Sequence, residues 1–207
     1  MIHQSYVLIL DFGSQYTQLI ARRIRENAVF CEIHPFDMGM DVVQRRKPSA
    51  IVLSGGPASV YDPEAPQLDT RIVELGLPIL GICYGLQAIT HTMGGKVESA
   101  REREYGRANL TSVNPSSLLL EGISAGAQVW MSHGDKVIAL PEGFFPTAAT
   151  PDTVAAAFES GDHRICGVQF HPEVVHTPQG STIIKNFLFK IAELKPDWSM
   201  ASFLETT

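Results

Sequence analysis

A cysteine between two glycines is the residue in this sequence best suited to covalent chemistry. Cys83 follows the apolar run 78–82 and precedes a helical pattern, and Gly81 and Gly85 flank it. Small residues there let a strand pass sharply into a helix, with the residue at the tip strained and exposed. The positive end of the helix dipole favours a thiolate. We therefore predict a nucleophile, against the alternative of one more buried cysteine.

A base with its own orienting carboxylate follows a second apolar run. His171 and Glu173 come after the run 165–170, and Pro172 separates them. Proline steers the preceding residue toward an extended conformation, in which residues i and i+2 project to the same side. Glu173 can then accept the imidazole N–H, fix the tautomer and stabilise the imidazolium. Because parallel strands end at one edge of a sheet, we expect Cys83 and His171 to meet there.

Acyl transfer to sulfur also needs donors for the developing oxyanion, and the sequence offers two backbone N–H groups. One belongs to Tyr84, directly after the cysteine. The other belongs to Gly56, in the Gly-Gly-Pro turn after the apolar run 50–53, although this turn would equally suit an ordinary loop. With these donors the set of residues fits thioester chemistry.

Two other sequence patterns contain the residue types of a serine nucleophile site and of a metal site, but the secondary structure that such sites need is not predicted around them. The segment 122–126 matches a serine nucleophile elbow, but no clear strand leads into it and no helix follows, so we interpret it as a loop. His171, Glu173 and His176 are metal-ligand types, but Pro172 prevents a helical ligand face, so we expect no metal. The sequence contains neither GxxxxGK[ST] nor GxGxxG, so nothing suggests that this chain alone binds ATP or a dinucleotide.

Alternating strands and helices are expected to position these residues. The first half predicts strands over 6–10, 29–36, 50–53 and 78–82, and helices over 16–26, 42–46, 64–75 and 84–93. This alternation favours a mainly parallel sheet covered by helices on both faces, that is, an α/β fold. The C-terminal half reads as strand-rich and mixed. Its expected strands are 96–100, 107–113, 128–132, 136–140, 144–150, 153–159 and 165–170, followed by a helix over 181–194.

Composition indicates an ordinary globular chain with one core. The 207 residues are 44% hydrophobic and 18% charged, with a net charge of −6 that argues against binding to phosphate backbones. Three dispersed cysteines are too few for a disulfide framework, which suits a reducing compartment. We find no signal-peptide pattern and no apolar stretch near 18 residues, so we expect a cytoplasmic protein without a membrane partner.

Three motifs together resemble the class I, triad-type glutamine amidotransferases, and in order and spacing they cover nearly the whole chain. They are Leu53–Pro57, Gly81–Gln87 and Gly167–Glu173. More narrowly, segments 10–16, 130–136 and 171–177 are similar to the N-terminal amidotransferase domain of the bacterial, fused type of GMP synthase. The resemblance implies a flavodoxin-like fold, an amidotransferase domain over 1–195, and the start of an interdomain linker over 196–207.

The resemblance also implies roles for individual residues. Cys83 would attack the side-chain amide of glutamine, His171 would protonate the departing ammonia, and water would then cleave the thioester to give glutamate. Glu173 would orient His171, and Gly56 and Tyr84 would supply the oxyanion hole. The substrate-binding residues implied in the same way are Gln87, His133, Gly134 and Asp135.

A partner domain is implied too. In the complete enzyme, ammonia would pass to an ATP-pyrophosphatase (synthetase) domain, expected beyond Thr207, that adenylates XMP and aminates it to GMP in purine biosynthesis. We therefore expect glutamine as substrate, ATP and Mg²⁺ only in that domain, no cofactor in this one, no nucleic-acid partner, and low activity alone. A homodimer is one option for the full-length enzyme. The residues expected to contact the synthetase domain are Glu104, Asp135, His176 and Thr177.

Three alternatives stay open. The chain could serve another pathway, such as anthranilate or carbamoyl phosphate synthesis, which would show in the synthetase that it activates. It could be a catalytically silent regulatory module, which a glutaminase assay of Cys83→Ala beside the parent would decide. It could also be a cysteine peptidase-like hydrolase, in which case it would turn over peptides and not glutamine.

Overall fold

The computed structural model describes residues 5–199, without the side chains of residues 100–103. Its strands are β1 (Tyr6–Asp11), β2 (Phe30–Pro35), β3 (Ala50–Leu53), β4 (Ile79–Ile82), β5 (Lys96–Asn109), β6 (Ser112–Val113), β7 (Gln128–Ala139), β8 (Phe144–Ala149), β9 (Ala157–Ser160) and β10 (Ile165–Val168). Its helices are α1 (Thr17–Glu26), α2 (Met40–Arg46), α3 (Thr70–Glu74), α4 (Tyr84–Thr92) and α5 (Gly180–Asn186), which continues as the π-helical turn η1 (Phe187–Ile191).

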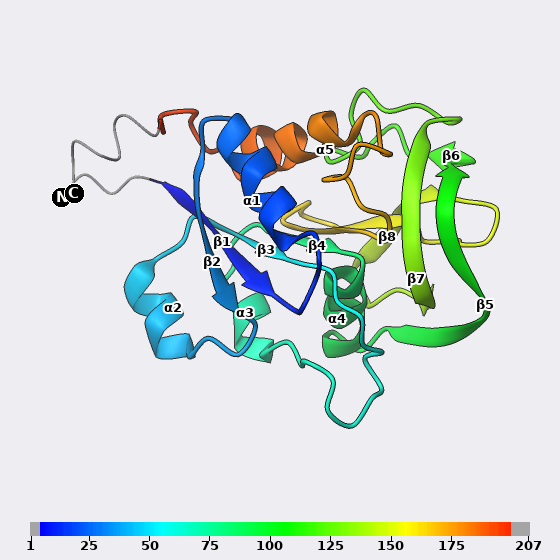
Figure 1. Ribbon diagram of the computed structural model, residues 1–207, viewed down its shortest axis with the longest axis horizontal. Coiled ribbons are helices and arrows are strands. Elements are labelled where there is room, and N and C mark those ends of the chain that lie inside the picture. Colours follow the sequence, from blue (N-terminus) through cyan, green and yellow to red (C-terminus); the bar gives the residue numbers. More distant parts are fainter. Residues whose placement is uncertain (1–4, 200–207) are drawn as a thin grey trace.

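An eight-stranded sheet carries the fold, in the order β2-β1-β3-β4-β10-β9-β8-β6 (Figure 1). The strands from β2 to β10 in this order are parallel, and β9, β8 and β6 each pair antiparallel with the strand before them. The α/β fold with a mixed, strand-rich C-terminal half is confirmed. Because β4 and β10 are direct neighbours, the segments that follow them leave the sheet side by side.

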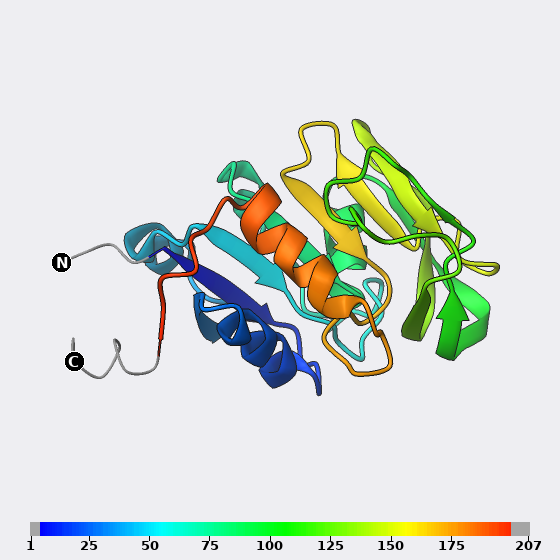
Figure 2. The same ribbon diagram turned by 90° about the horizontal axis from the view of Figure 1, so that it is seen from above.

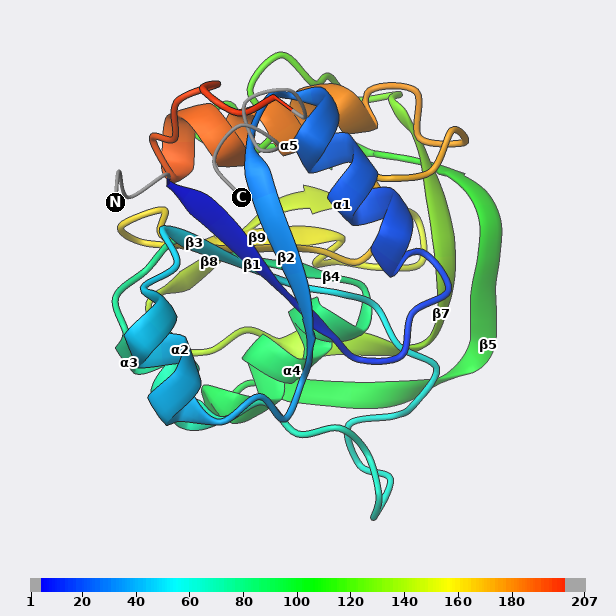
Figure 3. The same cartoon turned by 60° about the vertical axis from the view of Figure 1, so that its left-hand side comes forward.

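Helices cover both faces of this sheet, as Figures 2 and 3 show, because the buried strands are apolar on both sides. In β1, Val7 and Ile9 pack in the same core as α1 and α5, whereas Leu8 and Leu10 pack in the core shared with α2, α3 and α4. This alternation follows from the two-residue period of a strand. The predicted double cover is therefore present.

The second sheet is a long antiparallel ribbon of β5 and β7, which curves along one side of the molecule (Figures 1 and 3). The prediction of four short strands over 96–113 and 128–140 is wrong, because the pairing of β5 with β7 continues past Gly106 and Gly134. Alternate residues of β7 are buried. On that buried face lie Val129, Met131, His133, Asp135 and Val137, so two polar side chains interrupt an apolar row.

The helix predicted over 64–75 is also wrong in its first half. Only Thr70–Glu74 is helical, and the Asp69 side chain caps it by accepting from the Arg71 N–H. Proline has no N–H to donate, so Pro66 does not support a helix there. Residues 64–69, before the helix, instead cross the surface as an irregular segment, which we call the strap. The hydroxyl of Tyr84 donates to the Pro66 carbonyl at 2.6 Å and anchors this strap.

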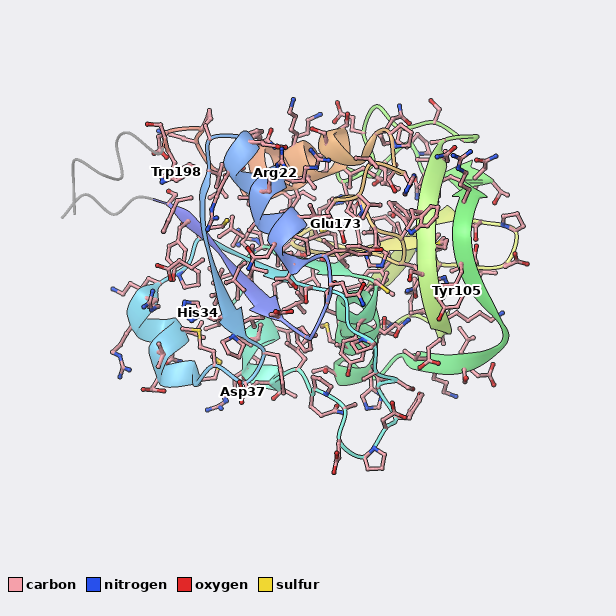
Figure 4. All side chains as sticks on the ribbon, in the orientation of Figure 1. Arg22, His34, Asp37, Tyr105, Glu173 and Trp198 are labelled. Atoms are coloured by element: carbon pink, nitrogen blue, oxygen red, sulfur yellow. The ribbon has the colours of Figure 1, made fainter. Side chains whose placement is uncertain are left out.

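The start of the predicted linker packs on the domain. The Trp198 backbone N–H donates to the Ala28 carbonyl at 2.9 Å, and its ring lies 6.0 Å from that of Phe30, beside β2 (Figure 4). The remainder of the predicted linker, 200–207, lies outside the described residues, so the boundary at residue 195 stays a prediction. Within residues 5–199, no helix is long and apolar enough to cross a membrane.

Candidate active site

Cys83 lies in the turn between β4 and α4. Its backbone has φ 53° and ψ −105°, a positive φ that a residue with a side chain adopts only under strain. The Cys83 N–H donates to the Val168 carbonyl at 2.8 Å and ties the turn to β10. A Cβ on Gly85 would lie 2.5 Å from the Leu53 carbonyl oxygen, so only glycine allows α4 this close to β3. The predicted strand-to-helix turn is thus present, but the Cys83 side chain at its tip is buried and not exposed as predicted.

His171 follows β10 and lies next to Cys83. Its Nδ1 is 2.7 Å from Oε1 of Glu173, and because a carboxylate only accepts, Nδ1 carries a proton and Nε2 is left for proton exchange. Burial lowers the pKa of His171, but its hydrogen bonds to Cys83 and Glu173 and their negative charges outweigh burial and raise it to about 10. An imidazolium beside a cysteine supports the thiolate.

Glu173 and the backbone of His171 are held firmly. The Glu173 side chain is fully buried, and Nε of Arg23 on α1 donates to its carbonyl oxygen at 3.1 Å. Figure 4 shows Glu173 beside α1. The Thr177 hydroxyl donates to the His171 carbonyl at 2.7 Å, and the His171 N–H donates to the Trp130 carbonyl on β7 at 3.0 Å. These contacts fix the orientation of the imidazole.

A cavity of about 550 Å³ opens over Cys83 and His171. Loops after β1 and β3, the start of α4, and both strands of the β5–β7 ribbon form its walls. Within the described chain, the backbone N–H groups of Gly56 and Tyr84 donate to no other group, so both are available to an oxyanion. The sequence-predicted residues that line the cavity are Gly56, Cys83, Gln87, His133, Gly134, Asp135 and His171.

Residues 132–135 of β7 form one wall, and two buried amides connect this wall to the sulfur. The Gln87 Nε2 donates to the Asp135 carbonyl at 2.8 Å and to Oε1 of Gln169 at 3.2 Å. The Gln169 Nε2 lies 3.8 Å from Sγ of Cys83, and the Ser132 carbonyl oxygen lies 3.6 Å from the same sulfur. The site therefore brings together a cysteine, an imidazolium, two unengaged backbone N–H groups and a polar pocket, which are the groups that amide transfer to sulfur requires.

Residues 8–191 match the family model described as glutamine amidotransferase class I. The chain belongs to this family. Its sequence is 55% identical over 199 residues to the GMP synthase [glutamine-hydrolyzing] of Brachyspira hyodysenteriae and 52% identical over 204 residues to that of Acetivibrio thermocellus. These matches cover 96% and 99% of this chain, but only 38% and 40% of the two relatives.

Solved structures agree with the family. A GMP synthase subunit from Thermoplasma acidophilum is 28% identical and superposes with a TM-score of 0.78, covering 100% of this chain and 98% of that one. A glutamine amidotransferase from Thermotoga maritima, 21% identical over 99% of this chain and 90% of that one, has a TM-score of 0.68 and shows the fold alone. The chain is thus a class I glutamine amidotransferase domain, homologous to the glutamine-hydrolysing part of GMP synthases.

Several residues of this amidotransferase site were missed from the sequence. Gln169 is one, although a single polar residue within the buried run 165–170 is a usable signal. Tyr16 is another, since it lines the cavity and its ring meets that of His171 edge-on at 5.1 Å. Ser132 contributes only a backbone carbonyl, which no residue type reveals.

The structure also places the residues of the serine-like motif, of the possible metal cluster and of the expected partner contacts. Ser124 of the serine-like motif is exposed in a loop, as predicted. His176 stacks on Trp130 with ring centroids 4.4 Å apart, while His171 and Glu173 bind each other, and the described residues contain no group of three or more His, Cys, Asp or Glu side chains fit to hold a metal ion. Of the four residues expected to contact a partner, Asp135 and Thr177 are buried in this domain.

Proposed function

We propose that this chain hydrolyses glutamine to glutamate and ammonia through a thioester on Cys83. The thiolate adds to the side-chain carbonyl carbon of glutamine, and the N–H groups of Gly56 and Tyr84 bind the resulting oxyanion. The His171 imidazolium gives its Nε2 proton to the departing ammonia. Water, deprotonated by the now neutral His171, then cleaves the thioester, which releases glutamate and restores the Cys83 thiolate and the His171 imidazolium.

The observation that carries this proposal is the set of contacts around His171. The fully buried Glu173 accepts the Nδ1 proton at 2.7 Å, so the other ring nitrogen is the one available to Cys83. The positive φ of Cys83 places its sulfur at the N-terminus of α4, where the helix dipole favours negative charge. A silent regulatory module would have no need for a strained cysteine beside a buried imidazolium.

The proposal extends to the fate of the ammonia. Relatives that are 51–55% identical to this chain are named GMP synthases, and this chain spans about two fifths of their length. We therefore assign the ammonia to an ATP-dependent synthetase domain that aminates XMP to GMP in the cytoplasm. ATP and Mg²⁺ would act in that domain, and this domain would need no cofactor.

Labelling with a glutamine-mimicking diazoketone, read by intact-protein mass and peptide mapping, tests the nucleophile. We expect one adduct on Cys83, blocked by glutamine and absent in Cys83→Ala. Cys31→Ala is the matched control, because burial raises the pKa of Cys31 to about 11 and keeps this thiol unreactive. An adduct that glutamine does not block, or one on another residue, would contradict the proposal.

A second assay tests the coupling. Glutamate release should rise when the synthetase domain, ATP and XMP are added, because partner contact completes such sites. If glutamate release responded instead to the synthetase of anthranilate or carbamoyl phosphate formation, the pathway would have to be reassigned while the glutaminase chemistry stands.

A further inference from the structure

A second histidine–carboxylate pair lies at the pocket, away from Cys83: His133 is buried and lines the cavity, and the partly buried Glu104 lies behind it. His133 on β7 and Glu104 on β5 are direct cross-strand partners in the ribbon. The ring Nε2 of His133 is 3.2 Å from Oε2 of Glu104, with 2% and 14% of the two side chains exposed. The carboxylate lies off the ring N–H direction, so the contact is an ion pair more than an aligned hydrogen bond.

The surroundings of the ring decide where its protons lie. On the other side, Nδ1 of His133 is 2.8 Å from the Asp135 carbonyl oxygen, which can only accept, so Nδ1 carries a proton. A neutral ring would then leave Nε2 without a proton 3.2 Å from an oxygen of the Glu104 carboxylate, where two acceptors face each other. A carbonyl oxygen and a carboxylate on opposite sides of one imidazole are both satisfied only when both nitrogens are protonated.

Glu104 is itself held as an anion. The hydroxyls of Thr153 and Thr150 donate to its two oxygens at 2.8 and 3.3 Å. Burial raises the pKa of Glu104, but these donors and His133 outweigh burial and lower it. The loop between β8 and β9 thereby fixes the carboxylate that faces His133.

The Asp135 carbonyl joins this pair to the substrate pocket. It accepts from Nδ1 of His133 and also from Nε2 of Gln87, both at 2.8 Å. Gln87 lines the cavity and contacts Gln169 beside the sulfur. A neutral His133 would keep its Nδ1 donor but lose its charge, so the Asp135 carbonyl would be held less strongly at the bulged part of the ribbon, where β5 and β7 shift register between Ser99 and Glu104.

We propose that Glu104 is a positioning residue that keeps His133 as an imidazolium, which in turn holds the Asp135 carbonyl and Gln87 in the conformation that binds substrate. Glu104 is not among the residues that line the cavity over Cys83, so its effect should fall on binding and not on the chemical step. The role of this pocket in binding glutamine rests on the proposed function. The other titratable side chains that line the cavity are Tyr16, Asp62, Cys83, Tyr105, Asp135 and His171.

Two measurements on the 207-residue chain test this role. The first is nitrogen-15 NMR of the histidine rings, with His133 assigned from a His133→Asn variant. Both ring nitrogens of His133 should be protonated near neutral pH in the parent. In Glu104→Gln only Nδ1 should be, because the new amide can donate to a neutral Nε2. A neutral His133 in the parent would overturn the proposal, whatever Glu104→Gln shows, and this result needs no substrate.

The second measurement is the concentration dependence of labelling of Cys83 by the glutamine-mimicking diazoketone. Losing a charge-assisted contact in Glu104→Gln should raise the half-saturating concentration about tenfold, with the limiting rate within about twofold. Glu98→Gln, an exposed residue on the same strand, should leave both unchanged. The positioning role would be refuted if Glu104→Gln lowered only the limiting rate. It would also be refuted if His133 became neutral in this variant while the half-saturating concentration stayed the same. If the diazoketone does not label Cys83 in the parent, the proposed function fails. The NMR measurement would still show whether Glu104 and His133 form an ion pair.

Discussion

Replacing Glu173 by glutamine removes one charge from the buried centre of the site and leaves its shape almost unchanged. The amide oxygen can still accept the Nδ1 proton of His171, so the tautomer is preserved. What disappears is the negative charge that helps to raise the His171 pKa from 6.5 to about 10. A hydrogen bond to a charged group contributes about 1.5–3 kcal/mol, which corresponds to about one to two pKa units.

The assay for this variant is the pH dependence of Cys83 alkylation by iodoacetamide, followed by intact-protein mass. Because the pKa of His171 would fall from about 10 to about 8–9, the variant loses the imidazolium that supports the thiolate in this pH range, so alkylation of Glu173→Gln at about pH 9 should be severalfold slower than in the parent. Nitrogen-15 NMR should show His171 losing its proton at a lower pH. Glu142→Gln, an exposed charge in the turn before β8, is the control. An unchanged or faster alkylation rate in the folded variant would refute the role assigned to Glu173.

Three further predictions follow from the same contacts. Gly85→Ala would place a Cβ 2.5 Å from the Leu53 carbonyl oxygen, so it should lower the free energy of unfolding by about 1–3 kcal/mol in guanidinium denaturation. Gly161→Ala is the control. Its Cβ would have its nearest contact at 3.5 Å, so it should change the free energy of unfolding by less than about 0.5 kcal/mol. Because folding raises the pKa of His171, its contribution to stability is complete below pH 6.5 and lost as the pH rises through about 10, so the parent should lose more stability over this range than His171→Gln. Thr177→Val removes the donor to the His171 carbonyl and should slow diazoketone labelling about fivefold; an unchanged rate would contradict this interpretation.

The parallel part of the fold could be predicted from the sequence because its signals are local. Four short apolar runs, each followed by a turn and a helical pattern, leave few topologies for a covered sheet. Cys83 between two glycines and His171 two residues before Glu173 carry their chemistry in residue type and spacing. The structure then had only to place β4 beside β10.

The ribbon and the strap could not be predicted, because long-range contacts decide them. The strands β5 and β7 look like four short strands in the sequence, since the glycines within them resemble turn signals and only cross-strand pairing keeps the chain extended. The strap before α3 depends on the Tyr84 hydroxyl, which is 18 residues away from Pro66. The Glu104–His133 contact was missed for the same reason, although polar residues at alternating buried positions of β7 are a signal for it.

The positive φ of Cys83 has a consequence for how the sequence of this domain can evolve. A residue with a side chain held in such a conformation costs about 1–3 kcal/mol, so Cys83, the proposed nucleophile, occupies a position that glycine would adopt without strain. Loss of Cys83 to glycine would therefore remove the chemistry and relieve the fold at the same time. In lineages where glutamine hydrolysis no longer matters, nothing in folding would oppose that substitution, and a stable, inactive descendant of this domain is within one mutation.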